Sequence, residues 1–183
     1  MVYESIFDYL KDDERFLQVY NMCISMEKAI LTNSYNASLI LSRTASELIM
    51  KLIADDSEFR MDFLKTNDYG DPILHDGVPE FISLKNMIKK SREHGLIGTN
   101  AQDRYTFIRE VGNSNVHGEG LANYGINDSK EAHKHLFFIS IHGYNRLNNT
   151  NIQLMYEDLL SNYDFKIEVS PKERDEQVAN VRF

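Results

Sequence analysis

A helical period of apolar residues is the feature of this 183-residue sequence that most constrains its fold. Between residues 34 and 54, apolar and small side chains recur every three or four positions, which is the spacing of one face of an α-helix. The stripe consists of Ala37, Leu41, Ala45, Leu48 and Leu52, and it is widened by Ile40, Thr44 and Ile49. We expect a helix with so broad an apolar face to lie at the centre of a bundle.

The same period continues along most of the chain and predicts an all-α fold, a bundle of about four to six helices. The expected helical segments are 13–31, 34–54, a short piece at 57–66, 80–94, 101–117, about 128–147 and about 152–161. Helix ends are expected where capping residues stand: Asn33 or Ser34, Gly95, and Asp128 or Ser129. Turn dipeptides predict a long surface loop over 67–79.

The predicted domain organisation is one helical domain over 1–163, followed by a separate segment at 164–183. Residues 165–169 alternate in hydrophobicity, as a short strand does, and the rest of the segment is charged. The segment is therefore expected to be an edge strand, a tail or a linker to a further domain, and the sequence leaves these three readings open.

The composition limits the cellular compartment and the partners that we expect for the chain. No apolar run is long enough for a transmembrane helix and no secretory signal opens the sequence, so we expect a cytoplasmic protein without a membrane partner. The single cysteine, Cys23, lies in an apolar helical pattern and is expected to be buried. The net charge of −8 disfavours indiscriminate binding to nucleic acid.

The basic residues are concentrated in the middle of the chain. Residues 80–117 hold six Lys and Arg against four Asp and Glu, whereas the chain as a whole is acidic. An anionic partner is therefore expected to meet this segment. The candidates for contact with a nucleic-acid backbone are Lys85, Lys89, Lys90 and Arg92.

Arg109, Asn113 and His117 form the most informative pattern. Their four-residue spacing keeps all three within an arc of about 80° on one helix face, and about 12 Å separates the first from the last along the axis. Histidine moves protons near neutral pH, and arginine offers a permanent charge and forked donors that match phosphate oxygens. The three residues supply what metal-independent RNA cleavage needs: an acid or base, an orienting amide and a cation.

A purely structural reading of the same residues is also open. Gly112 inside a helix costs about 1 kcal/mol, and Asn113 and His117 are residue types that cap helix ends or satisfy buried carbonyl groups. The remaining histidines, His133, His135 and His142, do not form a metal-ligand set, so neither a metal nor another cofactor is expected. Glu47 is interpreted as a partner of Arg43 on the same helix.

These residues resemble a known family. The shared features are Ala-Ser-Glu-Leu at 45–48, an Ile/Leu-x-x-Lys helix at 82–90 that runs to Gly95-Leu-Ile, the run Ile108-Arg-x-x-Gly-Asn-x-x-Val-His117, and a following apolar helix at 130–147. Together they resemble the helical domain of unknown function near the N-terminus of type I restriction enzyme R subunits, which looks like a member of the HEPN superfamily. The resemblance covers residues 13–147.

The resemblance implies a bundle of four or five helices that pairs as a homodimer. In the ribonuclease members of the family, the arginine and histidine of the motif are catalytic without a metal, and here these residues would be Arg109 and His117, with Asn113 as the polar partner. More residues separate the arginine from the histidine here than in typical nuclease members. Many relatives are non-catalytic binding or dimerisation modules.

Three hypotheses follow for the function. The first is a HEPN-like protein of microbe–phage conflict that acts on RNA, as a candidate metal-independent endoribonuclease for a defined or protein-bound RNA. The second is a non-catalytic dimerisation or interaction module of a restriction or defence system, docked on a nucleic-acid-processing protein. The third is an acidic, phage-encoded inhibitor of the anti-CRISPR type, which imitates nucleic acid with its negative charge.

Overall fold

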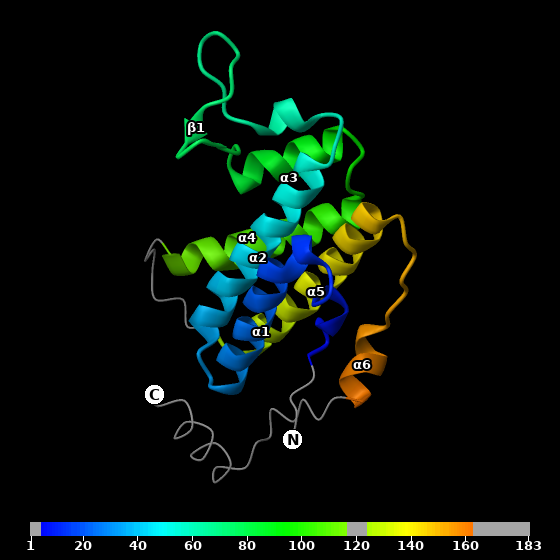
Figure 1. The fold of residues 1–183 in the computed structure, drawn as a ribbon. Coiled ribbons are helices and arrows are strands. Elements are labelled where there is room, and N and C mark those ends of the chain that lie inside the picture. Colours follow the sequence, from blue (N-terminus) through cyan, green and yellow to red (C-terminus); the bar gives the residue numbers. More distant parts are fainter. Residues whose placement is uncertain (1–4, 117–123, 163–183) are drawn as a thin grey trace.

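The chain is a bundle of helices with a short hairpin at one end (Figure 1). The structure, a computed structural model, describes residues 5–116 and 124–162. The strand predicted at 165–169 and the separate segment predicted at 164–183 lie outside the described residues.

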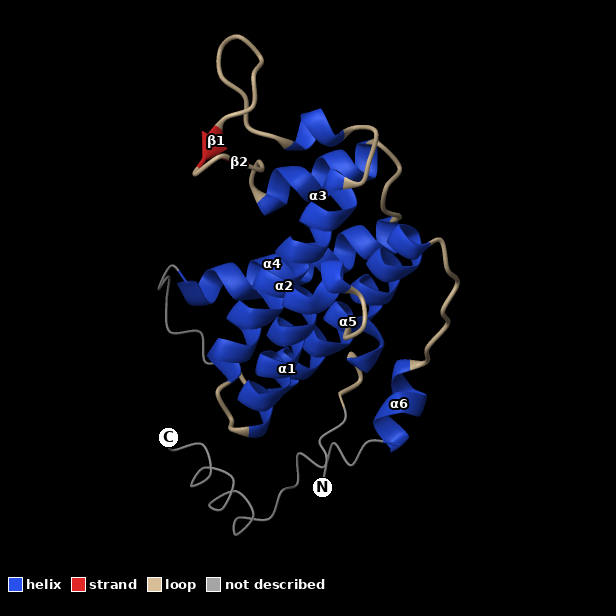
Figure 2. Cartoon of the chain, viewed as in Figure 1, coloured by secondary structure: helices blue, strands red, loops and turns tan. Residues whose placement is uncertain are grey.

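Six α-helices and one pair of very short strands make up most of the described chain (Figure 2). The helices are α1 Leu17–Leu31, α2 Tyr35–Asp55, α3 Leu84–Glu93, α4 Thr99–Val116, α5 Ile126–Asn148 and α6 Tyr156–Asn162. Three single turns of 3₁₀-helix accompany them, at Asp8–Leu10, Glu14–Phe16 and Arg60–Phe63. The predicted all-α fold is confirmed. None of the helices in the described ranges is long and apolar enough to cross a membrane.

Helix α2 is the central element, because α1, α4 and α5 all pack against it. Its buried face differs from the predicted stripe: Ala37 and Ile40 are exposed. The buried residues of α2 are Ser38, Leu39, Ser42, Ala45, Ser46, Ile49, Met50, Ile53 and Ala54. The serines are tolerated in the core because their hydroxyl groups bond within the helix, as in Ser42 Oγ to the Leu39 carbonyl at 2.8 Å. Their small size also lets neighbouring helices approach.

Residues 64–81 form an ordered arm, whereas the sequence predicted a loop only over 67–79. The short helix predicted at 57–66 is reduced to the 3₁₀ turn Arg60–Phe63. Strands β1 Leu74–His75 and β2 Val78–Pro79 pair antiparallel around a turn at Asp76 and Gly77, both with positive φ (51° and 80°). The arm also displaces the start of α3 from residue 80 to Leu84. The backbone N–H of Lys65 donates to the Glu80 carbonyl at 2.8 Å, so residue 80 belongs to the arm rather than to the helix.

The predicted helix ends are confirmed in one case and wrong in another. Gly95 ends α3 in the left-handed conformation (φ 67°), and the N–H of Leu96 reaches back to the Ser91 carbonyl at 2.8 Å, as in a Schellman motif. Helix α5 begins at Ile126 rather than at Asp128 or Ser129. Asp128 lies in its first turn, where its carboxylate accepts the backbone N–H of Gly125 at 2.9 Å.

A buried polar chain attaches α6 to the bundle. His133 of α5 places Nε2 3.1 Å from Oε1 of Glu27 on α1 and Nδ1 2.6 Å from the hydroxyl of Tyr156 on α6. All three side chains are buried, so the chain of contacts joins three helices inside the core. Cys23 is buried as predicted, and burial raises the pKa of its thiol.

Candidate functional site

Helix α4 carries two of the three predicted catalytic residues. Tyr105 and Ile108 are fully buried against the core, as their spacing predicts. Arg109 and Asn113, one turn apart, are half-buried beside that inward face. His117 follows the last residue of α4 and lies outside the described residues, so its predicted place on the same face is not tested. The structure therefore brings together Arg109 and Asn113.

The guanidinium of Arg109 is held by a neighbouring carboxylate at the surface. Its Nη2 donates to Oε1 of Glu110 at 2.9 Å. The Arg109 side chain is 19% exposed, whereas that of Glu110 is 62% exposed. An exposed pair of this kind contributes less than about 1 kcal/mol, so a phosphate group can replace the Glu110 carboxylate as the partner of Arg109.

Gly112, between Arg109 and Asn113, is where α2 crosses α4. A Cβ atom built at residue 112 would lie 2.5 Å from Cβ and 2.9 Å from Cδ of Arg43. Only glycine permits this approach, so the helix-weakening glycine of the motif has a packing role. It places Arg43 of α2 against the same part of α4 that carries Arg109 and Asn113.

Arg43 is the residue of this region that the sequence reasoning missed as a site residue. Its Nη2 lies 3.7 Å from Glu47, which confirms the predicted pair, but Glu47 makes a closer contact of 2.9 Å with Lys51. Within the described residues, the buried Nε atom of Arg43 has no hydrogen-bond partner. Residues three apart on a helix are neighbours, so Arg43, lying over Gly112, stands beside the turn that carries Arg109. Nothing in the sequence of α2 itself indicates that Arg43 lies against α4.

The predicted backbone-contacting residues lie on α3. Lys85, Lys89 and Arg92 are exposed and share one face of the helix, because they are spaced by four and three residues. Lys90 is half-buried and lies on another side. Arg92 donates to the hydroxyl of Thr99 at 3.2 Å, and Thr99 begins α4 about 15 Å before Arg109 along the helix axis. The basic face of α3 is thus anchored at the opposite end of α4 from Asn113.

The sequence also predicted that the remaining histidines do not form a metal-ligand set. His133 belongs to the buried chain with Glu27 and Tyr156, while His135 lies 2.9 Å from Nη1 of Arg104. Burial lowers the pKa of His142, and the nearby charge of Arg146 lowers it further. Within 5–116 and 124–162, no group of three or more His, Cys, Asp and Glu residues is placed to hold a metal ion.

Comparison of the chain with protein-family models, with curated proteins and with solved structures found no match. The geometry around Gly112 and the chemistry of its neighbours are therefore the observations that bear on function.

Proposed function

We propose that the chain acts on RNA as a metal-independent endoribonuclease with its site at the C-terminal end of α4, in a HEPN-like role in microbe–phage conflict. The observation that carries the proposal is the placement of Arg109 and Asn113 one turn apart on α4, with Gly112 between them against Arg43 of α2. Two guanidinium groups from two helices can bind the oxygens of one phosphodiester, which a single surface arginine holds weakly.

In this proposal each residue has a separate role. Arg109 and Arg43 bind the scissile phosphate and stabilise the charge that builds on its oxygens. The Asn113 amide orients a ribose hydroxyl or a phosphate oxygen. His117, the first residue after α4, exchanges the protons of the reaction.

The chemistry requires no group beyond these side chains and water. The ribose 2′-oxygen attacks phosphorus and the bond from phosphorus to the 5′-oxygen breaks, which leaves a 2′,3′-cyclic phosphate on one product. A base accepts the 2′-hydroxyl proton, and the departing 5′-oxygen receives one. His117 serves one of these transfers and water the other. The net charge of −8 favours a defined or protein-bound RNA over indiscriminate cleavage.

The experiment is cleavage of labelled structured RNAs in the presence of a chelator, including guide and transfer RNAs with and without their cognate proteins. Wild type is compared with His117→Ala and Arg109→Ala, and with Lys28→Ala as a control at an exposed position of α1. We expect both site variants to lose cleavage while their circular dichroism is unchanged. No cleavage by wild type, or cleavage by both variants as fast as by wild type, would refute the proposal.

A second candidate is a non-catalytic interaction module of a restriction or defence system. The ordered arm over 64–81 favours it, because the arm exposes large apolar side chains. Under this alternative the close approach of Arg43 and Gly112 only packs α2 against α4. The same cleavage assay separates the two candidates.

A further inference from the structure

The arm over 64–81 and the 3₁₀ turn just before it carry most of the large apolar side chains that the described residues leave exposed. Five of the eight belong to it or its immediate approach, and the fraction exposed reaches 91% for Tyr69, 64% for Val78 and 59% for Leu74. The five are Met61, Tyr69, Ile73, Leu74 and Val78. Scattered exposed apolar residues are ordinary, but such a concentration in one element marks a contact surface.

The arm is rigid enough to present these side chains in a fixed arrangement. The Asn67 side-chain oxygen accepts the backbone N–H groups of Tyr69 and Asp71 at 3.0 and 2.9 Å. At the base of the arm, Lys65 Nζ lies 2.7 Å from Glu80 Oε2. Figure 1 shows the arm extending away from the helices, and Tyr69 near its tip is exposed. A preorganised projection loses little conformational entropy when it binds.

The arm is also acidic. Asp68, Asp71 and Asp76 are all exposed, and the only basic side chain of the arm apart from histidine, Lys65, is paired with Glu80. A surface that combines carboxylates with a tyrosine and a leucine is complementary to an apolar cavity with a basic rim. Phosphate groups of a nucleic acid would be repelled by it.

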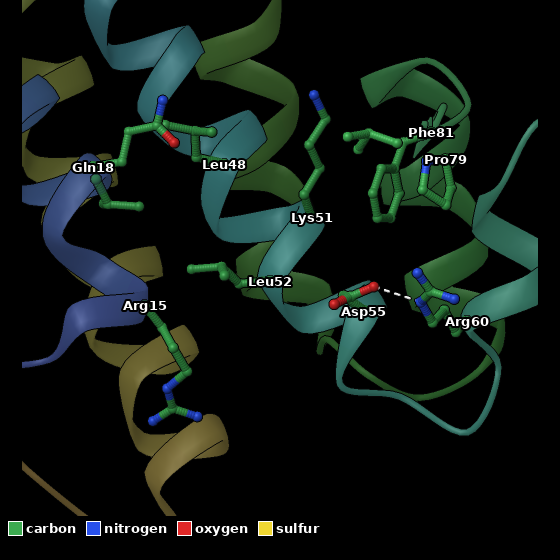
Figure 3. Close-up of a pocket in the computed structure, with 11 residues that line it drawn as sticks. Arg15, Gln18, Leu48, Lys51, Leu52, Asp55, Arg60, Pro79 and Phe81 are labelled. Atoms are coloured by element: carbon green, nitrogen blue, oxygen red, sulfur yellow. Dashed lines mark hydrogen bonds and ion pairs between the residues drawn. The ribbon is translucent and has the colours of Figure 1, made fainter. Parts of the chain in front are cut away.

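The same chain holds such a cavity at the base of the arm. A pocket of about 300 Å³ lies between α1, α2 and residues 78–81. Figure 3 shows Leu48 and Leu52 on the α2 side and Pro79 and Phe81 on the arm side, with Lys51 between them.

Two cations at the rim of this pocket are available to a second partner. Lys51 and Arg60 are partly exposed, and each is held by a single acidic side chain, Glu47 or Asp55. Surface pairs of this kind exchange partners at little cost. Arg15, which also lines the pocket, is already engaged, because its guanidinium donates to Asp13, to Asn148 and to the Leu147 carbonyl.

We propose that the acidic arm of one copy of this chain docks in the pocket at the base of the arm of a second copy. Tyr69 and Leu74 enter the apolar pocket, and Asp68 and Asp71 approach Lys51 and Arg60 of the other copy. The arrangement is reciprocal, since each copy offers one arm and one pocket, and it closes as a two-fold dimer. The proposal does not depend on RNA cleavage.

The test is sedimentation equilibrium of wild type, an arm variant (Asp68→Lys with Asp71→Lys) and a pocket variant (Lys51→Glu with Arg60→Glu). We expect wild type to be a dimer and each variant alone to dimerise at least about tenfold more weakly, because like charges then meet. An equimolar mixture of the two variants restores a heterodimer, because its reversed charges again pair. Lys28→Glu, on the exposed side of α1, serves as the control and is expected to dimerise as wild type does.

Three results would overturn the proposal: a monomeric wild type at every concentration, variants that dimerise as well as wild type, or a mixture in which no heterodimer forms. Circular dichroism of each variant shows that weakened association does not come from unfolding. Tyr69→Ala, which changes no charge, is expected to weaken the wild-type dimer as well.

Discussion

Arg43 lies directly over Gly112, so close that a Cβ atom at residue 112 would stand 2.5 Å from the Arg43 Cβ. This contact joins α2 to α4 between the two described residues of the proposed site. It also ties the packing of the bundle to the position of a guanidinium group, because Arg43 cannot move away from α4 without opening the helix crossing.

Gly112→Ala is expected to lower the free energy of unfolding by up to about 2 kcal/mol. Alanine in a helix would gain about 1 kcal/mol by propensity, but overpacking against the rigid Arg43 Cβ costs about 1–3 kcal/mol or more. Urea denaturation measures the difference. Gly98→Ala is the control, because no atom lies within 4 Å of a Cβ built there. A stabilised Gly112→Ala variant would show that the two helices separate easily.

Arg43→Ala is expected to lower kcat/KM for RNA about tenfold or more, through the loss of one of two cations at the phosphate. The measurement is single-turnover cleavage, with RNA binding followed separately. Lys85→Ala on α3 is a useful comparison. Loss of a lysine that only contacts the RNA backbone should weaken RNA binding and reduce the salt dependence of binding, without slowing the cleavage of bound RNA. Unchanged cleavage by Arg43→Ala would leave Arg43 with a packing role only.

The pKa of His135 is expected to lie below the ordinary value of 6.5. Burial is the main cause, and the Arg104 guanidinium, whose Nη1 lies 2.9 Å from Nδ1, adds to it, while Glu131 opposes both. The native state thus prefers neutral His135. Its contribution to stability is present above pH 6.5 and is lost as the pH falls through the lowered pKa.

NMR titration of the His135 ring tests this directly. In Arg104→Ala the pKa should rise, because the guanidinium no longer disfavours the charged ring. A titration in wild type at or above 6.5, or the same pKa in both proteins, would contradict the expected environment of His135.

Tyr156→Phe is expected to lower the free energy of unfolding by about 1–2 kcal/mol, because it removes a buried hydroxyl that bonds to His133. The ring and its contact with Phe137, at 5.4 Å between centroids, stay in place. Tyr35→Phe serves as the comparison, since the Tyr35 hydroxyl bonds to Asn33 at the surface and its loss should have little effect. Equal stabilities of the two variants would mean that the buried polar chain does not hold α6.

The helical fold was predictable because each long helix has its own apolar period, and α3 also has an end signal of its own in Gly95. The buried face of α2 was predicted less well, since a polarity scale places Ser42 and Ser46 outside, whereas their hydroxyl groups bond to the preceding turn. The two short strands of the arm were not predicted from the sequence. Asp76-Gly77 is a hairpin turn, but only two residues pair on each side, too few for a strand period.

The candidate site was predictable only along one helix. The four-residue spacing places Arg109 and Asn113 on one side of α4, because the direction of a side chain around a helix depends on local geometry alone. Arg43 was not predictable as their neighbour, because nothing in the sequence states where α2 crosses α4. The predicted roles of Arg109, Asn113 and His117 remain predictions.

The proposed endoribonuclease activity requires a 2′-hydroxyl at the cleaved bond, and this requirement can be measured with a single substrate pair. A single-site RNA substrate is compared with the same substrate carrying one 2′-deoxy sugar at that site, both in chelator with wild-type protein. We expect cleavage of the ribose substrate to a 2′,3′-cyclic phosphate and none of the deoxy substrate. Absence of cleavage in both substrates, or equal cleavage of both, would contradict it.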